Sequence, residues 1–258
     1  MLVGIETGYE GKFDFPRRAG PLEKTYLIAT VPRTGSTWFS HLLWQTGCLG
    51  APLEYLNFDP AGPYFFAAKS TSTQAQLWES VLSRRTSPNG VFGVKCFPGQ
   101  LEALQQANPD LLSSVMTRLL GRRGEGRVVF LQRRDPVAHA ISFARATISG
   151  VWRKEQEGEG AEVAYSEVAV KRASDWLETQ DAAWREMFSD LGIKPLELWY
   201  EDLIHDPGTT ILEVSEYLGV PLVPEHRIKV PVVERQSERD AKAWADRYSD
   251  NAQSAGAS

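Results

Sequence analysis

Apolar residues recur along the chain in two alternating patterns. Short apolar runs occupy 25–31, 90–97, 127–132 and 195–200, and such runs predict buried strands. The segments between them carry helical spacing, at 36–46, 101–120 with a break at Asn108-Pro109, 136–149, 167–191 and 207–218. Strands that alternate with helices predict an α/β fold in which a central parallel sheet is flanked by helices on both faces.

The same pattern suggests how the chain is divided. Residues 1–24 are rich in Gly, Pro and charge and are predicted to form an irregular arm, anchored by Phe13 and Phe15. Residues 25–250 are predicted to form a single domain, and 251–258 a disordered tail. The polar, acidic segment 150–163 is predicted to be a mobile loop.

Composition narrows the class of protein. The net charge of −5 does not favour a nucleic-acid-binding surface, although it allows a local anion site. Cys48 and Cys96 are predicted to be buried thiols, and no Cys/His cluster has zinc spacing. We find neither a signal peptide nor a membrane-spanning run, which predicts a cytoplasmic protein.

The first strand runs into the loop Pro32-Arg33-Thr34-Gly35-Ser36-Thr37. Such a loop lies at the carboxyl edge of a parallel sheet, where these folds bind ligands. Gly35 allows close approach of a ligand, the following helix N-terminus attracts anions, and Arg33 adds a positive charge. The loop therefore predicts a phosphate site, the alternative being a plain turn capped by Ser36.

This loop is not a Walker A sequence, because the lysine before Ser/Thr is missing. No acidic motif that would hold Mg²⁺ is evident either. A sulfuryl group carries less charge than a phosphoryl group, and its transfer needs no metal clamp. A small-molecule kinase of the P-loop class and a non-catalytic nucleotide-binding protein remain alternatives.

Four segments of the chain resemble segments of one known family and follow one another in the same order as in that family: 26–56, 90–97, 128–153 and 232–248. Together they resemble the Stf0 family of bacterial carbohydrate sulfotransferases. The resemblance implies a P-loop-like three-layer fold and 3′-phosphoadenosine 5′-phosphosulfate (PAPS) as the donor, with 3′-phosphoadenosine 5′-phosphate (PAP) as the product and no metal. It also implies an alcohol acceptor of the carbohydrate or glycolipid class and a homodimer.

The resemblance assigns roles to individual residues. It places the donor's 5′-phosphate on the loop residues Arg33, Thr34, Gly35, Ser36 and Thr37. It places the 3′-phosphate on Arg134 and on Ser142 eight residues later, with Arg133 as the substitute for Arg134. The alternative for Arg134 is a surface charge at a strand end.

The resemblance also indicates the catalytic groups. Glu54 is the expected general base, because it matches the glutamate that the Stf0 pattern places after the first helix. Cytosolic sulfotransferases have a histidine where this chain has Phe97. Lys95 and Arg33 are expected to stabilise the transferring group. The alternatives are an exposed loop carboxylate for Glu54 and an edge lysine for Lys95.

The last matching segment is expected to fold over the nucleotide, with Arg235 and Gln236 as contacts; a solvated helix face is the alternative. Trp152 and Arg153 either border the adenine or acceptor or simply pack. The four histidines, His41, His139, His205 and His226, are interpreted as structural or surface residues.

Two positions depart from the family pattern. Ala51 and Pro32 stand where the trehalose-sulfating members have an acidic residue and a glutamine. Those polar groups would bind sugar hydroxyls, so their loss disfavours trehalose itself as the acceptor.

Overall fold

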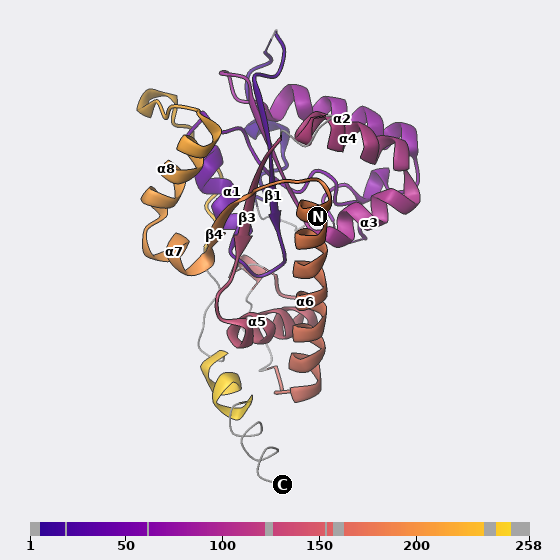
Figure 1. Cartoon of the computed structure of the whole chain (residues 1–258), viewed down its shortest axis with the longest axis vertical. Coiled ribbons are helices and arrows are strands. Elements are labelled where there is room, and N and C mark those ends of the chain that lie inside the picture. Colours follow the sequence, from indigo (N-terminus) through magenta and orange to yellow (C-terminus); the bar gives the residue numbers. More distant parts are fainter. Residues whose placement is uncertain are drawn as a thin grey trace.

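Four parallel strands form the centre of the protein in this computed structural model (Figure 1), which describes residues 6–18, 20–60, 62–121, 126–152, 154–156, 163–234 and 241–248. The strands are β1 (Lys24–Thr30), β2 (Val91–Cys96), β3 (Arg127–Gln132) and β4 (Leu196–Trp199). Their spatial order is β2-β1-β3-β4, with every neighbouring pair parallel. The predicted α/β class with a parallel sheet is therefore confirmed.

The helices follow the strands in the expected alternation. They are α1 (Ser36–Gln45), α2 (Thr71–Arg85), α3 (Pro98–Ala107), α4 (Pro109–Leu120), α5 (Pro136–Ser149), α6 (Glu167–Asp190), α7 (Tyr200–His205) and α8 (Pro207–Leu218). Short 3₁₀ turns lie at Gly11–Phe13, Phe65–Ala67, Lys154–Gln156 and Pro224–His226. Helices α2 and α7 were not predicted from the sequence pattern.

Polar caps followed by proline start three of these helices. Asn108, Asp135 and Asp206 each accept a hydrogen bond from the backbone N–H three residues ahead, and a proline follows each of them. Such a cap satisfies a donor that has no partner within the helix, and proline lacks the N–H that would be unpaired at that position. These caps explain why the helical pattern breaks at Asn108 and why α5 starts directly after β3.

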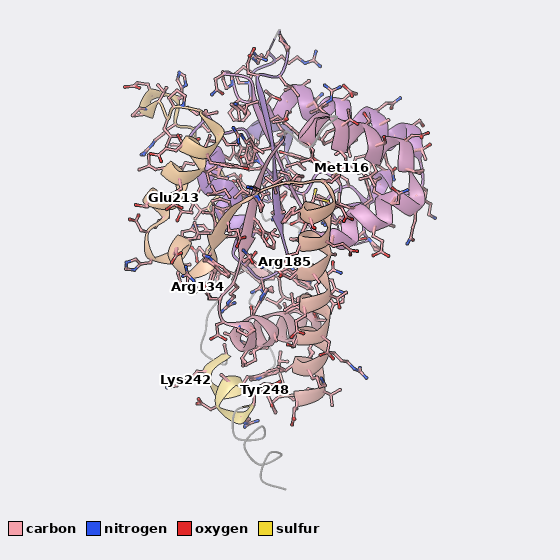
Figure 2. The ribbon with its side chains drawn as sticks, in the orientation of Figure 1. Met116, Arg134, Arg185, Glu213, Lys242 and Tyr248 are labelled. Atoms are coloured by element: carbon pink, nitrogen blue, oxygen red, sulfur yellow. The ribbon has the colours of Figure 1, made fainter. Side chains whose placement is uncertain are left out.

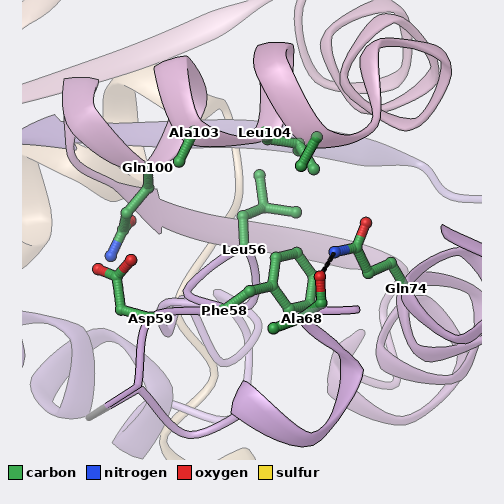
Figure 3. A pocket seen from close by; sticks show the side chains of 9 residues that line it. Leu56, Phe58, Asp59, Ala68, Gln74, Gln100, Ala103 and Leu104 are labelled. Atoms are coloured by element: carbon green, nitrogen blue, oxygen red, sulfur yellow. Dashed lines mark hydrogen bonds between the residues drawn. The ribbon is translucent and has the colours of Figure 1, made fainter. Parts of the chain in front are cut away.

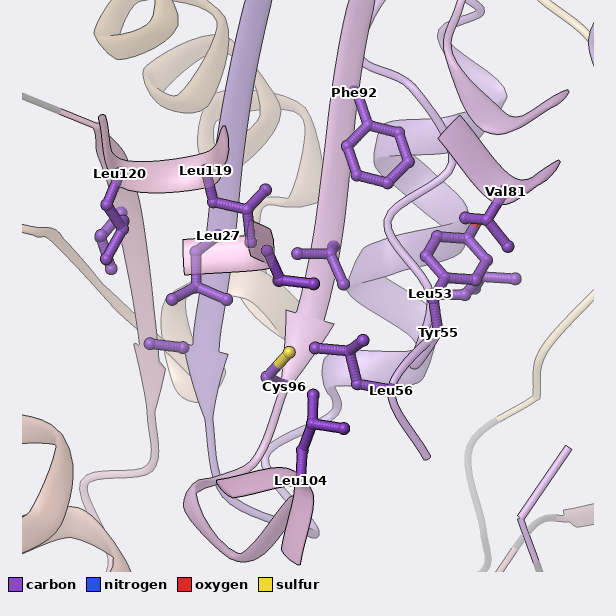
Figure 4. Close-up of a cluster of buried hydrophobic side chains, with 14 of the residues drawn as sticks. Leu27, Leu53, Tyr55, Leu56, Val81, Phe92, Cys96, Leu104, Leu119 and Leu120 are labelled. Atoms are coloured by element: carbon purple, nitrogen blue, oxygen red, sulfur yellow. The ribbon is translucent and has the colours of Figure 1, made fainter. Parts of the chain in front are cut away.

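The sheet separates two hydrophobic layers. One face of the strands, including Leu27, Phe92 and Phe130, packs against residues of α2, α3, α4 and α6 (Figure 4). The opposite face, including Ile28 and Val129, packs against residues of α1, α7 and α8. Both cysteines are buried, Cys96 in the first layer and Cys48 in the second, as predicted. This three-layer arrangement leaves the carboxyl ends of the strands to build a site.

The N-terminal arm is fastened to the domain by one buried guanidinium. Arg85 is 3% exposed, donates to the carbonyl oxygens of Gly8 (2.7 Å) and Glu10 (3.3 Å), and forms an ion pair with Asp14 at 3.0 Å. Phe15 is buried, which confirms its predicted anchoring role. The described part of the arm is thus held against the domain by specific contacts, although the 3₁₀ turn at Gly11–Phe13 is its one element of secondary structure within the described residues.

Candidate active site

The loop after β1 has a backbone shape that few residues tolerate. Arg33 has a φ of 70° and Gly35 a φ of 73°, both in the left-handed region. A Cβ atom at Gly35 would lie 2.8 Å from the ring of Tyr200, so glycine is required for space as well as for conformation. Left-handed backbone at a residue other than glycine costs free energy and is concentrated at functional sites.

Helix α1 begins at Ser36 without a side-chain cap. Its N-cap residue is Gly35, which has no side chain to accept from the first amide groups of the helix. The alternative of a plain turn capped by Ser36 is therefore not what the structure shows. An anion is the group that uncapped amides and the helix dipole favour.

Threonine side chains brace the loop from inside. The hydroxyl of Thr34 lies 2.7 Å from that of Thr30 and donates to the carbonyl of Val31 at 3.0 Å. Thr30 in turn donates to the carbonyl of Leu131 on β3 at 2.8 Å. Because Thr34 is fully buried, its hydroxyl supports the loop instead of facing outward.

His139 holds the loop from helix α5. Its Nε2 lies 2.7 Å from the carbonyl oxygen of Pro32. Burial, together with the neighbouring charges of Arg133 and Arg33, lowers the pKa of His139 to about 4, although the hydrogen bond to Pro32 opposes the shift. The ring is therefore neutral near pH 7, and Nε2 must carry the hydrogen that it donates to the carbonyl. This contact fits the structural role predicted for the histidine.

Arg33 bridges the two predicted phosphate-binding elements. Its Nε donates to the hydroxyl of Ser142 at 3.0 Å, and one terminal nitrogen donates to the carbonyl of Trp152 at 2.9 Å. The loop after β1 and helix α5 are thus brought together, as the sequence predicted. The residue that contacts Ser142, however, is Arg33.

Arg134 points elsewhere. Its guanidinium forms two 2.6 Å hydrogen bonds with the carboxylate of Asp202 and lies 5.1 Å from the ring of Trp199. It is exposed at the carboxyl end of β3 (Figure 2). The structure therefore does not place Arg134 on Ser142, because the chain turns after Gln132 and directs this side chain towards α7. A role for Arg134 in binding the donor stays a prediction.

Arg133, named as the substitute, faces the loop. Its side chain is 15% exposed, lies 4.8 Å from the ring of Tyr200, and donates to the carbonyl of Arg33 at 3.4 Å. Tyr200 is the same residue that packs on Gly35. The positive charges of Arg33 and Arg133 are thus both at the loop.

The predicted base and the predicted lysine are in direct contact. Lys95 is 1% exposed, and its Nζ lies 2.9 Å from Oε1 of Glu54 and donates to the hydroxyl of Thr37 at 3.1 Å. These three residues come from β2, the segment after α1 and the first turn of α1. Glu54 is thus not an exposed loop carboxylate and Lys95 is not an edge lysine, and the pair lies beside the predicted anion-binding loop.

The Glu54 carboxylate is held by several donors. Oε2 accepts from Nδ2 of Asn57 at 3.0 Å and from Nε2 of Gln100 at 2.9 Å. Gln100 is itself oriented, because its Oε1 accepts from the N–H of Phe97 at 3.1 Å. The backbone N–H of Glu54 donates to the hydroxyl of Tyr9 at 3.0 Å, so the N-terminal arm also contributes.

These contacts keep Glu54 ionised. Burial would raise the pKa of Glu54, but the positive charge of Lys95 and the hydrogen bonds from Lys95, Asn57 and Gln100 outweigh it and lower the pKa below its ordinary value. The side chain is 16% exposed, so it keeps some contact with solvent. A carboxylate ionised at neutral pH is able to accept a proton from a neighbouring hydroxyl.

Several supporting residues could not be found from the sequence. Gln100 and Tyr9 reach Glu54 from separate segments, and no spacing rule connects them. Trp152, which was predicted either to border a ligand or to pack, is exposed near Arg33. Trp244, in the last of the four matching segments, is buried against α5 and α6. Arg153, Arg235 and Gln236, the predicted tail and part of the predicted mobile loop lie outside the described residues.

Two other features are absent from the described ranges. No three His, Cys, Asp or Glu side chains there gather into a group that could hold a metal ion. None of the helices described above is long and apolar enough to cross a membrane.

Comparison with known proteins gives matches along most of the chain. A family model described as Stf0 sulphotransferase matches residues 25–251. The trehalose 2-sulfotransferase of Mycobacterium tuberculosis is 28% identical over 87% of this chain and 94% of its own length. That of Mycolicibacterium smegmatis is 27% identical over 88% and 95% respectively. The sulfotransferase domain from the curacin biosynthetic pathway covers 80% of this chain and 77% of its own at 17% identity, with a TM-score of 0.48.

Proposed function

The chain belongs to the Stf0 sulphotransferase family and is an enzyme of the sulfotransferase type, and we propose that it transfers the sulfuryl group of PAPS to a hydroxyl of a carbohydrate or related small-molecule or glycolipid acceptor. Family membership favours this function over the kinase and the non-catalytic binding protein considered from the sequence. The proposed reaction is a single in-line displacement.

In this proposal Glu54 is the general base. It takes the proton of the acceptor hydroxyl as that oxygen forms a bond to sulfur. The bond between sulfur and the oxygen of the donor's 5′-phosphate breaks, and PAP leaves with the electron pair. The ammonium group of Lys95 and the guanidinium of Arg33 offset the negative charge of the transferring group and of the leaving phosphate.

In this proposal the two phosphates of the nucleotide are bound by two different elements, the loop after β1 and the region around helix α5. The uncapped start of α1, with Gly35, Ser36 and Thr37, would hold the 5′-phosphate. Ser142 would help to hold the 3′-phosphate together with Arg134, which would have to leave Asp202, or with Arg133. Arg235 and Gln236 remain further predicted contacts.

One observation carries the proposal: Lys95 contacts both Glu54 and Thr37, at 2.9 and 3.1 Å. The cation is thus within hydrogen-bond reach of both the proposed base and the first turn of α1. An acceptor hydroxyl on Glu54 would be next to a sulfuryl group held at the start of α1. This is the arrangement that general-base transfer requires.

The experiment is Glu54→Gln, which keeps the shape of the side chain and removes the basic oxygen. We expect turnover with labelled PAPS to fall about 10²–10⁴-fold, the range that general bases contribute. Stabilisation against heat by PAP should persist, because the donor site is unchanged. Glu102→Gln, at an exposed position of α3, is the matched control and should keep full activity.

Near-normal turnover by Glu54→Gln with normal PAP binding would refute the role of Glu54. Stabilisation by ATP, with none by PAP, would refute the donor. A homodimeric assembly and a cytoplasmic location remain predictions from the sequence.

A further inference from the structure

The two oxygens of the Glu54 carboxylate have different partners. Oε1 lies 2.9 Å from the ammonium nitrogen of Lys95. Oε2 accepts two hydrogen bonds, from Nδ2 of Asn57 at 3.0 Å and from Nε2 of Gln100 at 2.9 Å. Each carboxylate oxygen has two lone pairs that can accept. Among the described residues, both lone pairs of Oε2 are therefore engaged, whereas Oε1 keeps one that is open.

The protein backbone holds both amides in one orientation. The side-chain oxygen of Asn57 accepts from the N–H of Asp59 at 3.2 Å. That of Gln100 accepts from the N–H of Phe97 at 3.1 Å. Because each amide oxygen is engaged in this way, each amide nitrogen is the atom that faces the carboxylate. Figure 3 shows Gln100 pointing from α3 towards the segment that carries Asp59.

Neutral amides suit a group that positions a base. An amide holds the carboxylate by hydrogen bonds without adding a second positive charge, which would lower the pKa of Glu54 further and weaken it as a base. If Oε2 took the proton of the acceptor, it would have to give up one of its two donors, and hydrogen bonds to charged groups are the strong ones. The proton is therefore taken most easily at the open lone pair of Oε1.

The open oxygen is also the one on the side of the donor. Lys95, which contacts Oε1, donates to the hydroxyl of Thr37 in the first turn of α1 at 3.1 Å. In the proposed function this turn holds the 5′-phosphate of PAPS. A hydroxyl bound at Oε1 is thus next to the cation that faces the transferring group, whereas a hydroxyl bound at Oε2 is next to the two amides.

We propose that Oε1 of Glu54 is the atom that takes the proton of the acceptor hydroxyl, and that Asn57 and Gln100 are positioning residues that hold Oε2 and so direct Oε1 at the acceptor. This inference rests on the proposed function and deepens it. The O–H bond of the acceptor breaks and an O–H bond to Oε1 forms. The electron pair of the acceptor oxygen forms the bond to sulfur, and PAP leaves with the pair of the S–O bond that breaks.

Gln100→Met tests the positioning role. The change removes the amide donor and keeps an unbranched side chain of similar length. Labelled ³⁵S-PAPS is offered with glucose, trehalose and octyl glucoside, and the acceptor that the unmodified protein uses fastest is kept for all variants. We expect kcat to fall about tenfold, because a hydrogen bond to a charged group is lost, while KM for PAPS and the PAP-induced shift in melting temperature stay unchanged. Gln105→Met, at an exposed position of the same helix, is the matched control and should keep full activity.

The pH profile separates positioning from a loss of packing. The hydrogen bond from Gln100 lowers the pKa of Glu54, so its removal raises that pKa. The acid limb of kcat/KM for the acceptor should therefore move to higher pH in Gln100→Met and stay in place in Gln105→Met. A purely structural role of Gln100 would not move this limb.

The other titratable groups around Glu54 do not interfere with this measurement. Burial raises the pKa of Tyr9 and of Cys96 above their ordinary values, so both keep their protons across the acid limb. Lys95 supplies the positive charge in contact with the carboxylate. Asp59, which lines the same small cavity as Gln100, is exposed, so water and salt screen its charge.

Asn57→Leu is a second, independent variant, which keeps the test valid if Gln100→Met folds poorly. It removes the other donor to Oε2 and leaves α3 unchanged. We expect a similar fall in kcat and an acid limb that moves in the same direction, again with unchanged KM for PAPS.

The outcomes separate the two proposals. An unchanged kcat in Gln100→Met and Asn57→Leu, with Glu54→Gln inactive, overturns this inference and leaves the proposed function intact. A lower kcat with an unmoved acid limb assigns the two amides to packing and also overturns it. No transfer of label to any of the three acceptors refutes the proposed function and this inference with it.

Discussion

Lys95→Met tests how much the protein depends on the ion pair at the centre of the site. The change removes the ammonium group while keeping a flexible side chain of similar length. Its partners are the Glu54 carboxylate at 2.9 Å and the Thr37 hydroxyl at 3.1 Å. Because the Lys95 side chain is 2% exposed and that of Glu54 16%, water can take over little of the lost interaction.

Removing one partner of a buried ion pair costs about 3–5 kcal/mol, because the other charge stays buried without compensation. Glu54 keeps its hydrogen bonds to Asn57 and Gln100, which places the expected loss near the lower end, at about 3 kcal/mol. Denaturant unfolding at pH 7 measures it. The double variant Lys95→Met/Glu54→Gln should be more stable than Lys95→Met alone, since it no longer buries an unpaired charge.

The same change should alter the pH dependence. The pKa of Glu54 is lowered in the folded protein, so its contribution to stability is present above the ordinary carboxyl pKa of about 4.3 and is lost as the pH falls through the lowered value. Without Lys95 the pKa of Glu54 rises, this contribution shrinks, and the acid limb of kcat/KM moves to higher pH. A loss of stability under about 1 kcal/mol together with an unmoved acid limb would refute the reasoning.

Two further predictions concern the donor site. Gly35→Ala should destabilise the protein by about 1–2 kcal/mol, because the φ of 73° at this position and the Tyr200 ring at 2.8 Å leave no place for a Cβ atom. The variant should also be stabilised less by PAP in a thermal shift assay, and unchanged stabilisation by PAP would contradict this prediction. Asp202→Asn should leave the stability of the protein almost unchanged, since the pair that Asp202 forms with Arg134 is exposed. The affinity of the Asp202→Asn variant for PAP, measured by calorimetry, should rise several-fold, because Arg134 is then released to bind the donor. An unchanged affinity would count against a role of Arg134 in donor binding.

The sequence predicted the elements where the local pattern was clear. The four apolar runs are the four strands, and the Asp135-Pro136 and Asp206-Pro207 signals mark true helix starts. Helix α2 was missed because polar side chains lie on its buried face. Gln74 and Arg85 are 2% and 3% exposed there, and only the folded protein supplies their partners.

The same limit applies to the candidate site. The resemblance pointed to Glu54 and Lys95, and the structure brings these two residues into contact. The eight-residue spacing of Arg134 and Ser142 could not indicate the direction of the Arg134 side chain, which depends on Asp202 in another element. Tyr9 and Gln100 act through contacts 45 and 46 residues apart in sequence, which no local pattern encodes.

The course of the N-terminal arm affects where the functional unit of this enzyme begins. The region shared with the family starts at residue 25, yet Tyr9 bonds the backbone of Glu54 and Arg85 fastens the carbonyls on either side of Tyr9. A chain trimmed to the shared region would leave the Glu54 amide without this acceptor and Arg85 without three of its contacts. The boundary of the family thus differs from the boundary of the folded catalytic unit, and a shortened protein made for crystallisation should retain the arm.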